Sequence, residues 1–201
     1  AVNRLQADMV AVTGDLVDGS VAQLRPHVAP LSGLTSRHGT YFVTGNHEYY
    51  SGVTAWVAEL RRLGVKVLLN EHVVLQHNDS ALVIAGVTDH SGHHFDESHR
   101  SDPAAAVATA PADVLRILLA HQPRSAEAAL QAGFQLQLSG HTHGGQFWPW
   151  NFFVRLQQPF TAGLDRLQTL WVYTSRGTGY WGPPKRFGAP SEITHLRLVP
   201  A

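Results

Sequence analysis

The chain contains the stretch Gly140-His141-Thr142-His143-Gly144-Gly145-Gln146, which follows the alternating run Phe134-Gln135-Leu136-Gln137-Leu138. In extended backbone, residues two apart point the same way, with Cα atoms roughly 6.5–7 Å apart. The imidazoles of His141 and His143 could therefore flank a pair of metal ions, which lie about 3.5–4 Å apart in two-metal sites. A polar turn with two solvated histidines fits this stretch equally well, so the rest of the chain must decide.

The composition is that of an ordinary globular chain. Its 201 residues, 44% hydrophobic and 15% charged, suffice for one domain with a sizeable core. Lys+Arg and Asp+Glu both number 15, so no bulk field attracts nucleic acid or acidic membranes. The chain has 13 histidines and no cysteine, which excludes disulfides, iron–sulfur clusters and thiolate zinc sites. A metal site must use nitrogen and oxygen ligands, which suit manganese, iron, zinc or magnesium.

No apolar run approaches the roughly 18–20 residues of a membrane span, and no signal-peptide pattern is present. No linker or repeat divides the chain, so we expect one domain over residues 1–201. Because the chain starts at Ala1 and enters a strand-like run almost at once, we interpret it as a piece of a longer protein. Its localisation then depends on sequence upstream.

Five short apolar runs end abruptly in polar residues, which predicts buried strands. Ligand sites of open α/β sheets gather at the carboxyl ends of strands, so one cleft would explain why all five ends carry Asp, Asn or His. The runs and their polar ends are 9–12 with Asp15, 41–44 with Asn46 and His47, 81–85 with Asp89 and His90, 117–120 with His121, and 136–138 with His141.

Helical patterns fill the gaps between these runs. Apolar residues recur at 3.6-residue spacing over residues 53–63, and Gly64 provides a plausible stop. Asp102-Pro103 before an alanine-rich run is typical of a helix start. Further helices are predicted at 123–132 and, interrupted by two prolines, at 21–34; further strands are predicted at 65–69, 73–76, 170–174 and 193–198. The mixture favours a sheet sandwich flanked by helices.

Each candidate site residue also has a structural interpretation. Asp15 could bridge two divalent ions or simply form a turn with Gly14, and Asp18 could orient a histidine or form a turn with Gly19. Asn46 could supply a neutral oxygen ligand or adopt left-handed backbone in a loop. His47 could be a ligand or protonate a leaving alkoxide. The isolated His121 could be a ligand or a hydrogen-bonded core histidine.

Taken in order, Gly-Asp-x-x-Asp, Gly-Asn-His-Glu, a strand-end histidine and Gly-His-Thr-His resemble the motifs of the calcineurin-like metallophosphoesterases. The resemblance runs from Asp8 to Leu198. It includes the tail Ser175-Arg176-Gly177-Thr178-Gly179 and Arg186-Phe187-Gly188-Ala189-Pro190-Ser191-Glu192-Ile193, similar to a bacterial subgroup often preceded by membrane helices. It implies an α/β (α+β) fold, a four-layer sandwich of two mixed β-sheets flanked by helices, and a parent protein anchored to the bacterial cell membrane by an upstream tether.

The resemblance also implies a role for each site residue. Two divalent metal ions share one carboxylate, and His47 is the catalytic acid, held by Asp18. The implied metal ligands are Asp15 on both ions, Asn46, His121 and His141 on the first ion, and His143 on the second.

One family motif is missing. The family begins with Asp-x-His on its first strand, which supplies two further ligands to the ion held by His143. No such motif precedes Asp15, and Asp8 is the only earlier carboxylate. We expect the motif and its strand to lie upstream, so that the domain is truncated at its N-terminus. Asp15 and His143 alone make a poor cage, whereas the first ion keeps its full ligand set.

The mechanism implied by the resemblance is hydrolysis. Two cations lower the pKa of a shared water, and the resulting hydroxide attacks phosphorus while His47 protonates the departing oxygen. Arg176 could bind a phosphoryl oxygen or be a surface arginine, and His90 could reach the same cleft. An aromatic segment could line the substrate's organic part, such as a lipid, or belong to the core; it comprises Trp148, Trp150, Phe152 and Phe153.

Three functional hypotheses follow. The first is a binuclear metallophosphoesterase acting on phosphomonoesters or, preferentially, phosphodiesters. The second is a non-catalytic scaffold or pseudo-enzyme that binds one metal. The third is a structural domain with surface histidines. The substrate stays open among nucleotides, glycerophosphodiesters, lipid-linked phosphates and sugar phosphates, because a fold does not specify its substrate.

Overall fold

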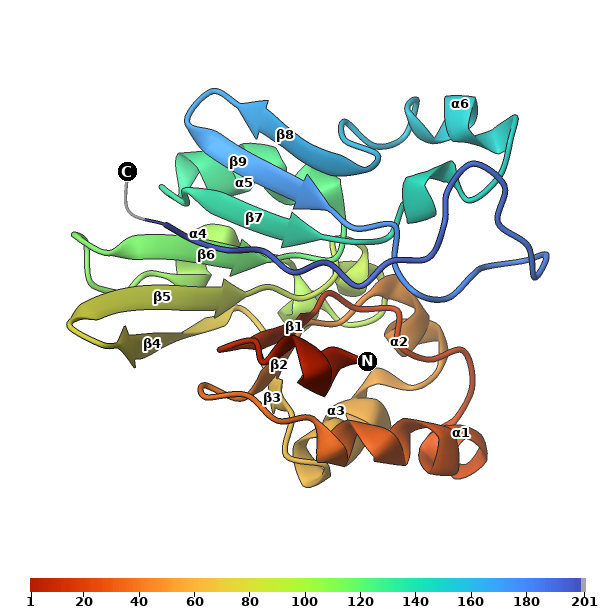
Figure 1. The fold of residues 1–201 in the computed structure, drawn as a ribbon, viewed down its shortest axis with the longest axis horizontal. Coiled ribbons are helices and arrows are strands. Elements are labelled where there is room, and N and C mark those ends of the chain that lie inside the picture. The colour runs from red at the N-terminus through yellow and green to blue at the C-terminus, as the bar shows by residue number, and fades with distance from the viewer. Residues whose placement is uncertain (200–201) are drawn as a thin grey trace.

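The computed structural model describes residues 1–199, and two β-sheets form its centre (Figure 1). The first sheet has three parallel strands in the order β1-β2-β3. The second has six strands in the order β4-β5-β6-β7-β9-β8, parallel except for the outer pairs β4/β5 and β8/β9. The strands are β1 Val10–Val12, β2 Thr40–Phe42, β3 Lys66–Val67, β4 Glu71–His77, β5 Ser80–Gly86, β6 Leu115–Leu119, β7 Leu136–Ser139, β8 Gly163–Leu167 and β9 Leu170–Thr174.

Helices follow most of the strands. The α-helices are α1 Val21–Val28, α2 Asn46–Tyr50, α3 Val53–Arg62, α4 Pro103–Ala106, α5 Ala126–Gln131 and α6 Trp150–Val154. The 3-10 helices are η1 Val2–Leu5, η2 Ala29–Gly33, η3 Gly92–His94, η4 Glu97–His99, η5 Pro123–Ser125 and η6 His143–Gly145. None of the helices within residues 1–199 combines the length and the apolar character needed to cross a bilayer.

Three groups of buried side chains separate four layers. Successive strand residues face opposite sides of a sheet, so Tyr41 packs between the two sheets while Phe42 packs against Trp56 and Leu60 of α3. On the far side of the second sheet, the buried Leu118 packs in a cluster with residues of α4 and α5. The order helix–sheet–sheet–helix confirms the predicted four-layer sandwich, with one correction: the first sheet is purely parallel, not mixed.

The helix α3 shows how local sequence positions the site. Its apolar spacing buries Trp56, Val57 and Leu60, and the helix ends before Gly64, whose φ of +84° suits glycine. The indole Nε1 of Trp56 donates a hydrogen bond to the carbonyl of Gly19 at 2.9 Å. This bond ties the loop that carries Asp18 to the core.

In the C-terminal part, one predicted strand is wrong and one observed strand was not predicted. Residues 193–198 alternate like a strand but have no regular secondary structure, because their backbone finds no partner strand; Ile193 and Leu198 stay exposed. The sequence analysis also missed β8, which pairs with β9 as an antiparallel hairpin across Gln168 and Thr169. Its low β-branched content gives no strand signal.

Candidate metal centre

The candidate centre lies where strands of both sheets end. In Figure 1 the arrows of β5, β6, β7 and β9 point to the same side of the molecule. Asp15 lies just beyond β1, His121 just beyond β6 and His141 just beyond β7, while Asn46 is the first residue of α2. Residues more than a hundred positions apart in the chain therefore meet at one edge.

Three of the five predicted ligands form a close cluster. The Asp15 Oδ2 atom lies 3.0 Å from Nε2 of His121, and that nitrogen lies 3.0 Å from Nδ1 of His141. One ligand atom from each of the three side chains lies within 4.8 Å of the others. No other group of three or more His, Cys, Asp or Glu residues within positions 1–199 has such geometry.

Gly45 allows the carboxylate of Asp15 to lie close to the start of α2. A Cβ atom on Gly45 would lie 2.2 Å from Asp15 Oδ1, so a side chain at this position would displace the carboxylate. The same Oδ1 atom accepts a hydrogen bond from the backbone N–H of His47 at 2.9 Å. The carboxylate is thus held against the start of α2 with Oδ2 directed at the histidines.

The orientation of His121 is set by a backbone hydrogen bond. Its Nδ1–H donates to the carbonyl of Thr13 at 2.6 Å, and only 1% of the residue is exposed. When one ring nitrogen carries the proton for such a bond, the other nitrogen of a neutral imidazole has a free lone pair. His121 therefore presents Nε2 to the cluster.

Asn46 supplies an independent test of whether a metal fits. Its Oδ1 atom is buried and has no hydrogen-bond partner among residues 1–199. A buried carbonyl oxygen left without a donor costs about 1–3 kcal/mol, and a metal ion would satisfy it. A carboxylate, an amide oxygen and two imidazoles form a donor set that suits a divalent transition metal.

In the absence of a metal ion, the positive charge beside the Asp15 carboxylate is a protonated His121. Burial opposes charge on both groups, but the ion pair outweighs it: the pKa of Asp15 lies well below its usual range, and that of His121 is raised to about 9. Burial and the neighbouring His121 charge lower the pKa of His141 to about 4. Near neutral pH, His121 is therefore the charged imidazole and His141 the neutral one.

This charge distribution predicts how metal affinity depends on pH. A metal ligand must be deprotonated, so binding at pH 7 has to release the proton of His121, while the neutral His141 releases none. The association constant for Mn²⁺ or Zn²⁺ should rise about tenfold per pH unit from pH 7 towards 9. Isothermal titration calorimetry in two buffers of different ionisation enthalpy should count about one released proton. An affinity independent of pH would contradict the assignment.

His47 lies at the rim of the cluster beside Asp18. Its Nδ1 atom is 3.3 Å from Asp18 Oδ1, and the side chains are 29% and 83% exposed respectively. The ring also meets Tyr50 edge-on, with centroids 5.4 Å apart. A partly exposed imidazole, oriented by a carboxylate and anchored through its own backbone to Asp15, can exchange protons with a ligand in the centre.

His143 lies outside the three-residue cluster. The Nη2 group of Arg186 donates to its Nδ1 at 2.8 Å, and burial together with the Arg186 charge lowers the pKa of His143 to about 4. Arg186 is itself fixed by the carbonyls of Arg176, Gly179 and Ala189. In this structure one ring nitrogen of His143 is thus already occupied by an arginine.

The two predicted substrate-binding residues are not among the three residues of the cluster. The Nη1 atom of Arg176 makes an ion pair with Glu192 Oε2 at 2.9 Å, and Glu192 also accepts from Tyr173. His90 lies on the loop after β5 and is exposed as a whole residue; partial burial of its ring, and then the charge of Arg124, lower its pKa. Arg176 would have to exchange its carboxylate partner for a phosphoryl oxygen.

The role of Glu48 was not predicted from the sequence. This carboxylate is 1% exposed and accepts three backbone N–H bonds: Oε2 from Asp15 at 2.9 Å and Gly45 at 2.6 Å, and Oε1 from Leu16 at 2.8 Å. Burial and the Asp15 charge raise its pKa to about 7. The available signal was its position three residues after Gly45, where a glutamate can accept a hydrogen bond from the N-cap N–H, as it does in the glutamate half of a capping box.

The buried side chains of Asp89 and Gln122 form a hydrogen-bonded pair next to His121 in the chain. Asp89 is fully buried and accepts hydrogen bonds to both carboxylate oxygens from Gln122 Nε2, each at 3.1 Å. Ser91 caps the same carboxylate through its N–H and hydroxyl group. Because Gln122 directly follows His121, this pair holds the ends of β5 and β6 together beneath the cluster.

A two-sheet sandwich with an Asp–His–His cluster at its strand ends is the arrangement of a metallophosphatase fold, and comparisons with known proteins agree. A family model described as calcineurin-like phosphoesterase matches residues 1–145. The chain is 45% identical over 212 residues to the Bos taurus "Transmembrane protein with metallophosphoesterase domain", covering 100% of this chain and 48% of that protein. It is 39% identical over 201 residues to an "Uncharacterized metallophosphoesterase" of Helicobacter pylori strain J99, covering 99% and 53%.

Solved structures show the same fold. A putative 5'-nucleotidase from Staphylococcus aureus superposes with a TM-score of 0.58 at 18% identity, over 85% of this chain and 40% of that one. The chain belongs to the calcineurin-like phosphoesterase family. It spans about half the length of the curated relatives that it matches.

Proposed function

We propose that this chain carries the catalytic centre of a metal-dependent phosphoesterase. The observations that support the proposal most strongly are the cluster of Asp15, His121 and His141 and the buried Oδ1 of Asn46, which has no hydrogen-bond partner among residues 1–199. These four residues would hold a divalent metal. When bound, the metal would supply an activated water and a positive charge that offsets the negative charge of the transition state.

We assign the general-acid step to His47, oriented by Asp18. His47 would donate a proton to the leaving oxygen of the ester, because it lies at the rim, partly exposed, next to the start of α2. Asp18 would hold the ring through Nδ1, leaving Nε2 to face the substrate. Arg176 and His90 are proposed as further contacts to the phosphoester, Arg176 by exchanging Glu192 for a phosphoryl oxygen.

The finer features of the proposal go beyond the family assignment. They are a second metal at Asp15 and His143, completed by ligands from elsewhere in the parent protein, and a preference for phosphodiesters. One relative is named a transmembrane protein, so we also propose that the parent is anchored to a membrane. The name of the structural neighbour, a nucleotidase, makes nucleotide phosphates one substrate class to screen.

A His47→Ala variant should test the acid. We expect kcat to fall by about 10²–10⁴ for an ester with an alkyl leaving group, because general acid catalysis contributes that much when the leaving oxygen needs a proton. The loss should be smaller for an aryl ester, whose leaving group is already stable as an anion. Steady-state kinetics with both ester types checks this, and Asp18→Asn should give a weaker version of the same pattern.

Metal affinity serves as the control for this experiment. His47→Ala should bind Mn²⁺ as tightly as the unmodified chain, because the described cluster does not include its ring. Chelation should abolish turnover of both. Equal losses for alkyl and aryl esters would argue against a role for His47 as the acid.

The contact between His143 and Arg186 favours a second candidate function, a non-catalytic domain that binds one metal. A guanidinium against His143 supplies positive charge where the second ion of an enzyme would lie. Metal analysis separates the two candidates: one bound ion per chain, without turnover under any of manganese, iron, zinc or magnesium, would support the scaffold.

A further inference from the structure

Two segments of the chain place large apolar side chains on the surface. The first is α6 with its flanking residues, and the second is the loop 177–189. Their exposed fractions include 65% for Trp148, 83% for Leu156 and 72% for Phe187. Together they form what we call the aromatic surface: Trp148, Trp150, Phe152, Phe153, Leu156, Tyr180 and Phe187.

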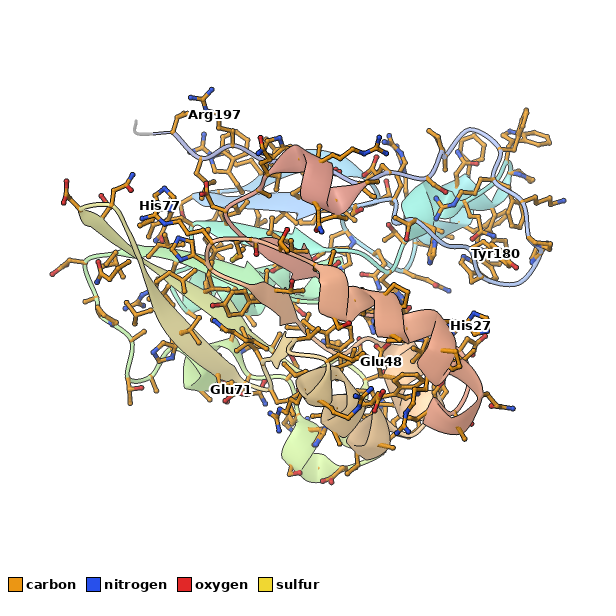
Figure 2. The ribbon with its side chains drawn as sticks, turned by 60° about the horizontal axis from the view of Figure 1, so that its bottom comes forward. His27, Glu48, Glu71, His77, Tyr180 and Arg197 are labelled. Atoms are coloured by element: carbon orange, nitrogen blue, oxygen red, sulfur yellow. The ribbon has the colours of Figure 1, made fainter. Side chains whose placement is uncertain are left out.

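The two segments form one continuous surface. The rings of Trp150 and Trp181 meet edge-on with centroids 6.0 Å apart. The side-chain amide of Gln146 donates to the carbonyl of Trp181 at 2.7 Å and accepts from its N–H at 2.8 Å. Figure 1 shows the loop passing close to α6, and Figure 2 shows Tyr180 on that loop beside the same helix.

The charged residues within the two segments of the aromatic surface are all basic. Neither residues 146–164 nor residues 177–191 contain an Asp or Glu, although the whole chain has no net charge. Arg155 and Lys185 are exposed there, and Lys185 Nζ lies 5.2 Å from the centre of the Phe147 ring. Exposed aromatic side chains with basic neighbours and no acids are complementary to an anionic lipid surface, where indole and phenyl rings settle at the headgroup level.

We propose that the aromatic surface docks this domain onto an anionic lipid bilayer. Burial in the interface removes from water the apolar side chains that the fold leaves uncovered, while Arg155 and Lys185 meet lipid phosphates. The proposal goes beyond phosphoester hydrolysis and does not depend on it.

Docking would also orient the metal centre. The helix α6 packs directly against η6, the short helix that contains His143: a Cβ atom on Gly145 would lie 2.3 Å from the Cα atom of Asn151. The two elements are therefore in direct contact. A bilayer that covers α6 lies next to the His143 edge of the centre, so the domain faces the membrane with its strand ends.

Vesicle co-sedimentation tests the proposal. The chain should bind vesicles of phosphatidylcholine mixed with phosphatidylglycerol, and Phe152→Ser/Leu156→Ser should weaken binding roughly tenfold or more. The matched control Val74→Ser/Leu115→Ser removes apolar side chains that are 43% and 39% exposed on β4 and β6, and should bind normally. Lys185→Gln should weaken binding to the mixed vesicles but not to phosphatidylcholine alone.

Fluorescence locates the contact. Lipids brominated in their acyl chains should quench the protein's tryptophan emission, and Trp148→Phe should lose much of that quenching while keeping vesicle binding. Trp171→Phe, which alters an exposed tryptophan on β9, should keep both. Circular dichroism of each variant confirms folding.

Three results would overturn the proposal. They are no binding to the mixed vesicles, equal binding by the two double variants, and a concentration-dependent dimer that Phe152→Ser/Leu156→Ser abolishes. The last result would assign the aromatic surface to a second copy of this chain.

Discussion

Replacing His141 with alanine is expected to remove most of the stabilisation that a divalent metal confers on this chain. A metal that binds only the folded state adds about 2.7 kcal/mol at a concentration a hundredfold above its Kd. His141 contributes an already neutral imidazole 3.0 Å from the nitrogen of His121, so its loss opens the cluster on one side. We expect the affinity for Mn²⁺ or Zn²⁺ to fall by at least about a hundredfold, which removes about 2.3 kcal/mol or more of that stabilisation.

Denaturant unfolding with and without metal measures this effect. The matched controls are His143→Ala, which alters the other histidine of the same motif, and His27→Ala, which alters an exposed histidine on α1 (Figure 2). Both should retain stabilisation by the first ion, because neither side chain belongs to the cluster. If His141→Ala and His143→Ala lose it equally, the two histidines serve one site and the division proposed here is wrong.

Replacing Glu48 with alanine should cause the largest loss of stability among single polar substitutions in the centre. The change leaves three backbone N–H groups without an acceptor, those of Asp15, Leu16 and Gly45. Each unsatisfied buried donor costs about 1–3 kcal/mol, and water can reach the two that are only partly buried, so we expect about 3–5 kcal/mol in total. Figure 2 shows Glu48 inside the fold.

Two variants control for this prediction. Glu48→Gln keeps one acceptor oxygen and should cost about 1–2 kcal/mol. Glu59→Ala also removes a carboxylate with little exposure, but one whose partners are the side chains of Arg25 and Arg62, which can turn to water. It should therefore cost less than Glu48→Ala. If Glu48→Ala and Glu59→Ala lose the same free energy of unfolding in urea, Glu48 does not hold the Asp15–Leu16 backbone to Gly45.

Glu48→Ala should also weaken metal binding although it supplies no ligand. Its carboxylate holds the N–H groups on both sides of the contact between Asp15 and Gly45, so the position of Asp15 depends on it. A stability loss without any change in metal affinity would limit Glu48 to a structural role.

The prediction of secondary structure succeeded where local pattern is sufficient. Apolar runs of four or five residues identify β1, β2, β5 and β6, because a strand buried on both faces needs little else, and the alternating run 134–138 identifies β7. The spacing of α3 and the Asp102 cap of α4 were equally clear, since 3.6-residue periodicity and an N-cap side chain act over a few residues. The same reasoning fails at residues 193–198, where alternation exists but no strand edge is available.

The order of polar strand ends indicated which side chains to consider, and the fold explains why they meet. Asp15, His121 and His141 were each ambiguous on local grounds, and the resemblance to a family assigned their roles. Their mutual distances depend on the parallel register of strands far apart in the chain; the bond from His121 to Thr13 spans 108 residues. A local pattern cannot specify such a distance.

Periodicity, turn residues and motif order can be read along the chain, and together with the resemblance to a family they predicted the sandwich, the strand ends and the candidate ligands. Long-range packing alone decided the rest. It buried Glu48 under the loops that carry Asp15 and His47, and it placed Arg186 against His143. It also left the segment around Trp148 exposed instead of in the core. Burial and charge pairing depend on which distant segments come together, and that information exists only in the folded chain.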